Sequence, residues 1–220
     1  MVDKDQILKR FRHYFYYKGD VDIDDEGVVN ITGTASLVST YSVKKLPVKF
    51  GIVSQLFKLA DLGLETLEGC PHTVGHFDCS RNKLTTLEHG PTMVYGSYQC
   101  NENKLENLLG APEQVSNLFT CNHNPLSSLE GLPQNGGTHL LRLKLPYSRT
   151  LPLLRVCFVE NKQVEFFGGG LNYPRKKMLE EIFNSPETQG PGGVLRAASM
   201  LAEVSQAPHN AYEFEGNAEL

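Results

Sequence analysis

The stretch YQCNENKLENLLGAPEQVSNLFTCNHNPLSSLEGLP, residues 98–133, contains the same pattern of residue types twice. Cys100 and Cys121 are 21 positions apart, and so are Asn103 and Asn124. Leucines and prolines within the stretch recur with the same spacing. A fixed period of about 20 to 50 residues is typical of repeat proteins, whose stacked units share one continuous core. This stretch therefore predicts a solenoid.

Further copies of the pattern lie on both sides of this stretch. The consensus is aromatic-x-Cys-x-x-Asn-x-Leu-x-x-Leu-(Glu)-Gly-x-Pro-x-x-Val, in which the glutamate is optional, and the preceding copy contains Phe77 and Cys79. That copy lacks one residue in the segment before Cys79, and an earlier, degenerate copy has Leu59 in place of the cysteine and Leu62 in place of the asparagine. Leu-Arg-Leu at residues 141–143 can serve as one more aromatic-x-Cys equivalent. We count about five coils, of which the outer ones are degenerate, as terminal capping repeats usually are.

Each position of the repeat has a physical role in such a coil. Alternate residues of a strand point to the same side, so Phe77 and Cys79 are expected to face the core together. A thiol suits the smaller of these two places because it packs as a small hydrophobic group. The asparagine that follows, Asn82 in this copy, is expected to turn inward and satisfy backbone groups of the neighbouring coils. The two leucines fill the floor of the coil, and Gly-x-Pro allows a tight turn into an extended return segment.

The repeat resembles leucine-rich repeats, in particular the short coils of secreted bacterial effectors, whose convex side is extended rather than helical. It is more closely similar to the repeat of a group of bacteriophage-encoded proteins. The similarity extends to three segments outside the repeats, which are LPVKFG at residues 46–51, LPLLR at 151–155 and FEGNA at 214–218. The resemblance implies a β-rich solenoid of leucine-rich-repeat type, with a parallel sheet and an extended convex side. It implies no particular activity, and Leu59 and Leu62 depart from the pattern.

Composition and charge limit the classes of partner and compartment. The chain has 220 residues, of which 40% are hydrophobic, and a formal net charge of −4. This charge gives no overall reason to expect binding to nucleic acid or to an anionic membrane. No apolar run reaches the roughly 18 residues that cross a bilayer, and the first residues are too acidic for a secretory signal. We therefore expect a cytoplasmic protein whose five cysteines are reduced thiols.

Three regions are expected along the chain. They are an N-terminal cap made of a helix and a β-hairpin (residues 1–45), the solenoid (46–145), and C-terminal strands and helices that cap the solenoid (146–220). In the first region, a helix over residues 5–17 with Asp3 as its N-cap precedes two alternating strands around an Asp/Gly turn.

The C-terminal region is predicted to begin with two strands within residues 151–167 that close the sheet. Helices are predicted over residues 175–184, next to a proline, and over residues 194–205. The buried stripe of the last helix is predicted to comprise Leu195, Ala198, Met200, Leu201 and Val204. Tyr212 and Phe214 are expected to dock back onto the cap.

Two groups of residues invite a metal site, and the sequence argues against both. An acidic cluster lacks the glycine and the glutamate that an EF-hand loop needs at its sixth and twelfth positions. Its members are Asp20, Asp22, Asp24, Asp25 and Glu26. The three repeat cysteines, with His76 and His123 nearby, would form a row at strand spacing rather than a tetrahedron, and no C-x-x-C pair is present. We therefore predict a solvated hairpin, core thiols, and neither a metal nor a cofactor.

No arrangement of residue types indicates catalysis. The repeat cysteines are expected to be buried and inert, whereas nucleophilic cysteine chemistry needs a thiolate beside a base in a cleft. GGG at residues 168–170 lacks the lysine and the hydroxyl residue of a phosphate-binding loop. The sequence contains no nucleophile elbow, no zinc-deaminase signature and no kinase motif set. The chain is therefore predicted not to be an enzyme.

Two surfaces are candidates for binding. The outward side chains of the strands should line one curved face, and solenoids commonly use such a concave sheet to bind extended protein surfaces. The predicted partner-binding residues are Lys58, His76, Asp78, Ser80, Ser97, Gln99, Asn101, Asn117, Thr120 and Asn122. The second candidate is a basic region, because residues 142–177 contain eight basic and two acidic side chains. The candidate basic patch consists of Arg142, Lys144, Arg149, Arg155, Arg175, Lys176 and Lys177.

These features predict a non-catalytic protein-protein interaction module. The resemblance to phage proteins implies an accessory protein that binds and modulates a host protein, such as a defence or gene-expression component. Two alternatives remain open at this point. One is nucleic-acid binding through residues 142–177, and the other is a structural role in a virion or multimer.

Overall fold

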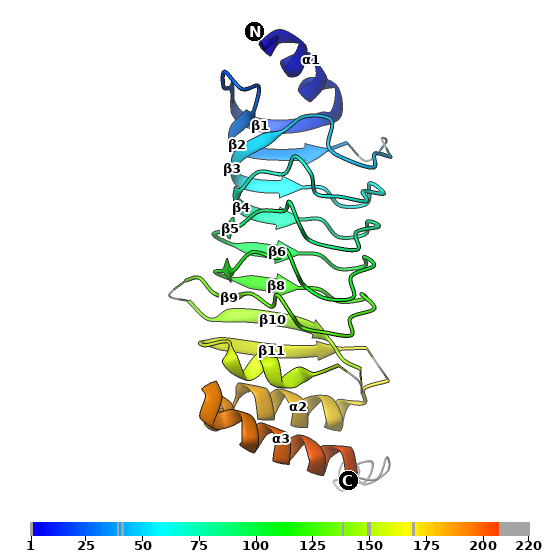
Figure 1. Ribbon diagram of the computed structural model, residues 1–220, viewed down its shortest axis with the longest axis vertical. Coiled ribbons are helices and arrows are strands. Elements are labelled where there is room, and N and C mark those ends of the chain that lie inside the picture. Colours follow the sequence, from blue (N-terminus) through cyan, green and yellow to red (C-terminus); the bar gives the residue numbers. More distant parts are fainter. Residues whose placement is uncertain are drawn as a thin grey trace, which may run out of the picture.

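The described part of the chain forms a β-solenoid closed by helices (Figure 1). The structure, a computed structural model, describes residues 2–38, 40, 42–137, 139–148, 151–168 and 170–206. Its sheet has eleven strands, and seven of them lie side by side in parallel, so the chain makes about six turns. In order these seven are β2 (Val29–Leu37), β3 (Phe50–Lys58), β4 (Thr73–Asp78), β6 (Ser97–Gln99), β8 (Leu118–Thr120), β10 (Leu141–Pro146) and β11 (Lys162–Phe167). The predicted parallel solenoid is confirmed, with about one turn more than the repeats indicate.

A second strip of short strands runs beside the main path. It comprises β5 (Met93–Val94), β7 (Gln114–Val115) and β9 (Gln134–Asn135), which pair with one another in parallel. After β5 and β7 the chain bends before the next strand begins, whereas β4 runs without a break. The connecting segment differs in length between these copies, because two residues separate Val74 from Phe77 and three separate Val94 from Tyr98. The residue missing before Cys79 therefore straightens one strand.

Aromatic side chains from consecutive coils stack along the interior. The ring centroids of Phe57 and Phe77 are 6.1 Å apart. The ring centroid of Tyr98 lies 5.2 Å from that of Phe77 and 5.7 Å from that of Phe119. These side chains are fully buried, and so are the three repeat cysteines. The predicted inward placement of the aromatic residue and the cysteine is confirmed, and ring contacts add to the free energy gained from their burial.

The predicted asparagine ladder is also present. Asn103 accepts the Leu84 N–H at 3.1 Å through Oδ1 and donates through Nδ2 to the carbonyl oxygens of Cys79 at 3.1 Å and Cys100 at 3.2 Å. The equivalent side chains in the neighbouring coils are Asn82 and Asn124. Backbone groups at the bend of each coil lie beyond the strand ladder, so a buried side-chain amide satisfies them instead.

The residue before each ladder asparagine has a left-handed backbone conformation. The φ angle is 55° at Arg81, 53° at Glu102 and 56° at His123. Residues with a Cβ atom are disfavoured in this region by steric contact with the backbone. Neighbouring coils hold the conformation in place, since the Glu102 N–H donates to the Asn122 carbonyl oxygen at 2.8 Å.

Replacing Glu102 by asparagine is expected to raise the free energy of unfolding by about 0.5–1 kcal/mol, because asparagine tolerates the left-handed region better than glutamate does. The Glu102 side chain is exposed, so the substitution removes little packing. Urea denaturation of the two proteins measures the difference. Glu106→Asn, at an exposed position without a positive φ, is the matched control and should change stability by less than about 0.5 kcal/mol. A Glu102→Asn protein that is less stable than the parent would contradict this reasoning.

The N-terminal cap contains the predicted helix and hairpin. α1 (Lys4–Tyr14) begins after Asp3, whose carboxylate accepts a backbone N–H of the first turn at 2.9 Å. β1 (Phe15–Ile23) then pairs antiparallel with β2. The helix ends three residues earlier than predicted, because Phe15 already starts β1 and stacks its ring on that of Phe11 at 5.4 Å.

The segment that precedes β11 differs from the prediction. The first of the two predicted strands is instead a 3-10 helix, η1 (Leu153–Phe158), while the second is confirmed as β11. η1 is the return segment between β10 and β11. Its buried residues Leu153 and Val156 are three positions apart, which is the period of a 3-10 helix and not of a strand.

Two α-helices close the C-terminal end of the solenoid (Figure 1). They are α2 (Tyr173–Asn184) and α3 (Gly190–Gln206), joined by the short η2 (Pro186–Thr188). In α3 the residues Ala197 and Val204 are buried, whereas Leu195 is 83% exposed. The prediction that Leu195 belongs to the buried stripe is wrong, because two residues along a helix turn a side chain to nearly the opposite side. Tyr212 and Phe214 lie outside the described residues.

Candidate functional site

Strand residues that point away from the core form rows across the coils. The register aligns one residue from each of six strands into what we call the outer row. Along the sheet its members are Lys58, Asp78, Gln99, Thr120, Lys144 and Glu165. Neighbouring strands are about 4.8 Å apart, so each of these side chains lies beside the next. The row begins with four of the predicted partner-binding residues.

A second group of polar side chains lies near the starts of these strands. The side chain of Asn117 donates to Ser97 Oγ at 3.5 Å and accepts from Arg142 Nη2 at 3.3 Å. The Ser97 N–H donates to Nδ1 of His76 at 3.0 Å. Each of these four residues belongs to a different coil, so the hydrogen bonds run across the sheet and hold the side chains in place.

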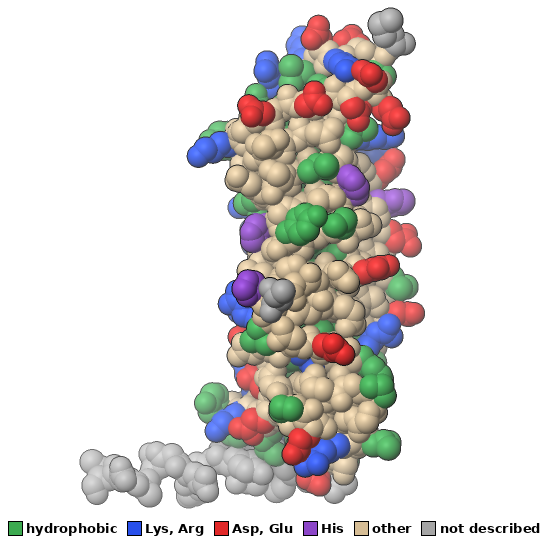
Figure 2. All heavy atoms as spheres, turned by 90° about the vertical axis from the view of Figure 1, so that its left-hand side faces the viewer, with side chains coloured by type: hydrophobic (Ala, Val, Ile, Leu, Met, Phe, Trp, Pro, Cys, Tyr) green, Lys and Arg blue, Asp and Glu red, His purple; other side chains and the backbone are tan. Residues whose placement is uncertain are grey.

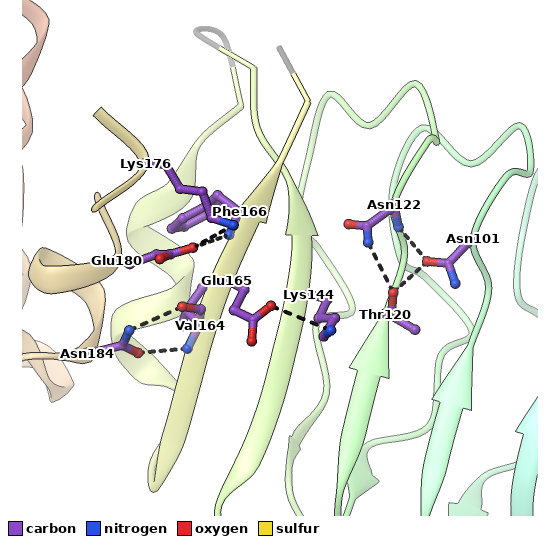
Figure 3. Close-up of polar contacts among 10 residues, drawn as sticks. All are labelled: Asn101, Thr120, Asn122, Lys144, Val164, Glu165, Phe166, Lys176, Glu180 and Asn184. Atoms are coloured by element: carbon purple, nitrogen blue, oxygen red, sulfur yellow. Dashed lines mark hydrogen bonds and ion pairs between the residues drawn. The ribbon is translucent and has the colours of Figure 1, made fainter. Parts of the chain in front are cut away.

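A third polar group lies at the ends of the strands. Asn101 Oδ1 accepts from Thr120 Oγ1 at 2.6 Å and from the Asn122 N–H at 2.8 Å. Asn122 Nδ2 donates to Thr120 Oγ1 at 3.3 Å, which closes a small network drawn in Figure 3. The network links the coils of β6 and β8.

Two of the predicted binding residues are not accessible. Ser80 is 5% exposed and Thr120 is 4% exposed. Strand alternation places Thr120 on the outer side, but the amides of Asn101 and Asn122 cover it there. The other eight, which we call the outer polar face, are exposed or half-exposed: Lys58, His76, Asp78, Ser97, Gln99, Asn101, Asn117 and Asn122.

The outer polar face differs in shape from the expected concave surface. The coils stack into a column that has no pronounced curvature in either view of the whole molecule (Figures 1 and 2). The sheet therefore offers a nearly flat strip along the long axis.

The predicted basic patch is divided among several elements. Arg142 and Lys144 lie on β10, Arg155 on η1, and the remaining described members on α2. Several of these cations have partners: Lys144 with Glu165 at 3.5 Å, Lys176 with Glu180 at 3.6 Å, Lys177 with Glu181 at 3.9 Å, and Arg175 with the Val204 carbonyl oxygen at 3.2 Å. Arg149 lies outside the described residues. Among the described members, the positive charge of the segment is thus partly neutralised and spread out.

The acidic hairpin has local partners. Asp24 Oδ1 accepts the N–H groups of Glu26 and Val28, both at 2.9 Å, and so shapes the turn. Asp25 pairs with Lys4 at 2.8 Å, and the hydrogen bond and charge of Lys4 lower the pKa of the Asp25 carboxyl. In the part of the chain that the structure describes, no three His, Cys, Asp or Glu side chains gather in a way that could hold a metal ion.

The repeat thiols lie inside the solenoid. Cys79, Cys100 and Cys121 are buried and free, and desolvation raises the pKa of each thiol above its usual value. His76 and His123 are exposed on the outside of their coils. The cysteines and the histidines are therefore on opposite sides of the backbone.

A buried lysine was not predicted from the sequence. Lys162 is 7% exposed, and its Nζ donates to the Val159 carbonyl oxygen at 2.9 Å and to Gln189 Oε1. Burial lowers the pKa of Lys162 to about 8. The alternation of side chains along β11 could have predicted this burial, because residue 162 shares the inward side with Val164 and Phe166. Lys162 thus joins the last strand to the C-terminal cap.

An exposed apolar group near the strand starts was also missed. Ile52, Met93 and Tyr95 are all exposed. A hollow of about 220 Å³ lies between Met93, Tyr95, Gln114 and Gly136. Figure 2 shows hydrophobic side chains gathered about midway along this side of the column.

Comparisons with known proteins assign the chain to no family, so its class is defined by its fold alone. No protein-family model, no curated protein and no solved structure matches the chain. The described residues define a parallel β-solenoid of about six turns with helices at its C-terminal end. None of its described helices has the length and apolar character needed to cross a bilayer.

Proposed function

We propose that the chain is a non-catalytic protein-protein interaction module that binds its partner through the outer polar face. The observation that carries this proposal is the strand register, which sets the accessible side chains of Lys58, Asp78 and Gln99 side by side on three successive strands. Repeat proteins bind extended partners through such surfaces, since every coil adds one position of contact.

The division between inside and outside supports a binding role. The aromatic residues, the thiols and the leucines of each coil are buried, and the ladder asparagines satisfy backbone groups. The outward side chains are the groups left to meet another molecule. Cross-coil hydrogen bonds, such as those of Asn117 with Ser97 and Arg142, hold several of them in place before binding. Such preorganisation reduces the entropy lost on association.

The chemistry of the face favours a partner recognised by hydrogen bonds. Lys58 and Asp78 are its charged members, and the others are amides, a hydroxyl and a histidine. Salt screens interactions between exposed charges much more than neutral hydrogen bonds, so affinity should depend weakly on ionic strength. Binding through phosphate contacts would instead fall steeply with salt.

We further infer that the solenoid is of leucine-rich-repeat type and that the chain is a bacteriophage accessory protein acting in the host cytoplasm. The Leu-x-x-Leu spacing and the asparagine ladder support the first inference. The resemblance of the repeat and its flanking segments to phage-encoded proteins supports the second. On this proposal the partner is a protein of the bacterial host that the chain modulates.

The test is affinity purification from bacterial lysate with the tagged protein and a Gln99→Arg/Asn117→Arg variant. Both positions belong to the outer polar face, on the neighbouring coils of β6 and β8. Two long cations there should block close contact and leave charges unpaired at an interface, so recovery of the partner should fall by about tenfold or more. Quantitative mass spectrometry of the eluates at low and moderate salt provides the measurement.

The control variant is Glu106→Arg/Ser127→Arg, which places the same side chain at exposed positions on the loops. It should recover the partner as the parent protein does. Equal recovery by the face variant, equal loss in the control, or release of the partner by a modest rise in salt would each count against the proposal.

A further inference from the structure

The two ends of the sheet are finished differently. At the C-terminal end, the outer edge of β11 is occupied by side chains of α2 (Figure 3). The Val164 N–H donates to Asn184 Oδ1 at 2.7 Å, and Asn184 Nδ2 donates to the Val164 carbonyl oxygen at 3.1 Å. The Phe166 N–H donates to Glu180 Oε1 at 3.0 Å. A helix thus supplies the bonds that a further strand would make, which is one way to protect a sheet edge.

At the N-terminal end, the hydrogen bonds that flank the hairpin show which groups of β1 point outward. The Val38 N–H donates to the Tyr14 carbonyl oxygen at 2.9 Å, and the Asp24 N–H donates to the Val28 carbonyl oxygen at 3.1 Å. The pairs Tyr14/Val38 and Asp24/Val28 extend the antiparallel β1–β2 register at its two ends, and both are hydrogen-bonded pairs. In an antiparallel ladder the bonded pairs alternate, so even-numbered residues of β1 bond to β2. The N–H and C=O groups of the odd-numbered residues point to the outer edge.

Three residues carry these outward groups along the middle of β1. Within the described residues, the edge-facing N–H and C=O groups of Tyr17, Gly19 and Val21 have no hydrogen-bond partner. Gly19 is exposed and has no side chain that would hinder an approaching backbone. Among the residues described, the helix α1 makes no hydrogen bond to these groups, and its buried Phe11 packs on the core side, with ring centroids 6.0 Å from Phe50 and 5.0 Å from Tyr17.

The side chains of β1 alternate between half-buried apolar and exposed charged residues, and this pattern favours a particular kind of added strand. Tyr17 and Val21 are half-buried on the core side, while Lys18, Asp20 and Asp22 are exposed on the outer side. Neither Lys18 nor Asp20 forms an ion pair with another described residue. An apolar strand would leave these charges unpaired across the ladder, whereas opposite charges directly across from them would stabilise the pair.

We propose that the outer edge of β1 is a second binding site, which takes an extended segment of a partner protein as an additional antiparallel strand. The segment has apolar residues facing Tyr17 and Val21, basic residues opposite Asp20 and Asp22, and an acidic residue opposite Lys18. The occupant is a single segment rather than a second copy of the chain, because α1 rises beyond β1 at this end of the column and would stand in the way of a second solenoid (Figure 1). The site is separate from the outer polar face and does not depend on it.

A synthetic peptide with blocked ends tests the proposal, and Val-Lys-Val-Lys-Val-Glu-Val is the probe. In antiparallel register its lysines lie opposite Asp22 and Asp20 and its glutamate opposite Lys18. Titration into the isotope-labelled protein should give saturable shifts of the backbone amide resonances of Tyr17, Gly19 and Val21. The charge-reversed peptide Val-Glu-Val-Glu-Val-Lys-Val should bind at least about tenfold more weakly, because every cross-strand pair becomes a like-charge pair.

Backbone chemistry separates strand addition from simple charge attraction. N-methylation of the peptide valines removes the N–H groups that would face β1 and should abolish binding, while N-methylation of the lysines and glutamate should not. On the protein side, Val21→Pro removes an outward N–H without touching the β2 ladder and should also abolish binding. Val21→Thr, which keeps the N–H, should bind the peptide as the parent does.

Four results would overturn the proposal. Shifts centred elsewhere, equal binding of the charge-reversed peptide, or binding that survives valine methylation would exclude strand addition at this edge. A mass measurement that shows a dimer disrupted by Val21→Pro would assign the edge to a second copy instead. If Val21→Pro lowers the melting temperature markedly, the methylated peptides still decide the question on the unaltered protein.

Discussion

Replacing Asn103 by alanine is expected to lower the free energy of unfolding by about 3–5 kcal/mol. The Asn103 side chain lies in the middle of the ladder and bonds to the Leu84 N–H and to carbonyl oxygens of Cys79, Cys100 and Asn101. Each of these bonds contributes about 1 kcal/mol, and a buried donor left without a partner costs about 1–3 kcal/mol more. In the alanine variant the buried Leu84 N–H loses its acceptor, Asn103 Oδ1.

Urea denaturation followed by circular dichroism measures the effect, with Asn117→Ala as the control. Asn117 is also an asparagine held by neighbouring coils, but it is exposed on the outer polar face. Its removal should change stability by less than about 0.5 kcal/mol, since water can replace the lost partners. Equal effects of the two substitutions would show that the ladder does not hold the coils together as described.

The thiols of Cys79, Cys100 and Cys121 are expected to react with a thiol reagent at least about a thousandfold more slowly than an exposed thiol does. All three side chains are fully buried, so reaction requires the coils to open. Desolvation also raises the pKa of each thiol, which disfavours the reactive thiolate. Mass spectrometry after timed alkylation identifies the labelled cysteines.

An added cysteine on the surface gives the reference rate. Asn117→Cys places a thiol on the outer polar face of the same protein, where it should be labelled rapidly. In denaturant, the repeat cysteines should react as fast as this reference. Rapid labelling of the three thiols in the native protein would mean that the interior of the solenoid is not packed as described.

Much of the interior was predictable because each coil repeats the same local requirement. Phe77 and Cys79 alternate along a strand, and Asn82 follows at the bend, so a single copy already indicates which side chains point inward. The N-terminal helix with Asp3 as its cap was predictable for the same local reason, because its hydrophobic face and its capping residue lie close together in the sequence.

The candidate site was predictable as a set of outward positions but not as a surface. Alternation identified Lys58, Asp78 and Gln99 as outward residues in neighbouring coils, and the register sets them side by side. It could not show that Thr120 is covered by Asn101 and Asn122. Nor could it show that the face is flat, because curvature depends on small rotations between successive coils that no residue type encodes.

The sequence by itself determined the stacked coils, the buried aromatic and thiol rows, and the asparagine ladder. Each of these follows from a repeat in which the same residue types occupy the same positions of every copy. Only the tertiary structure decided how the sheet ends, with β11 closed by Asn184 and Glu180 and β1 left open. It also decided that Lys144 on β10 meets the carboxylate of Glu165 on β11. The physical reason is that these outcomes depend on where separate elements, such as α2 and β11, come to rest against each other. Local periodicity carries no information about that placement.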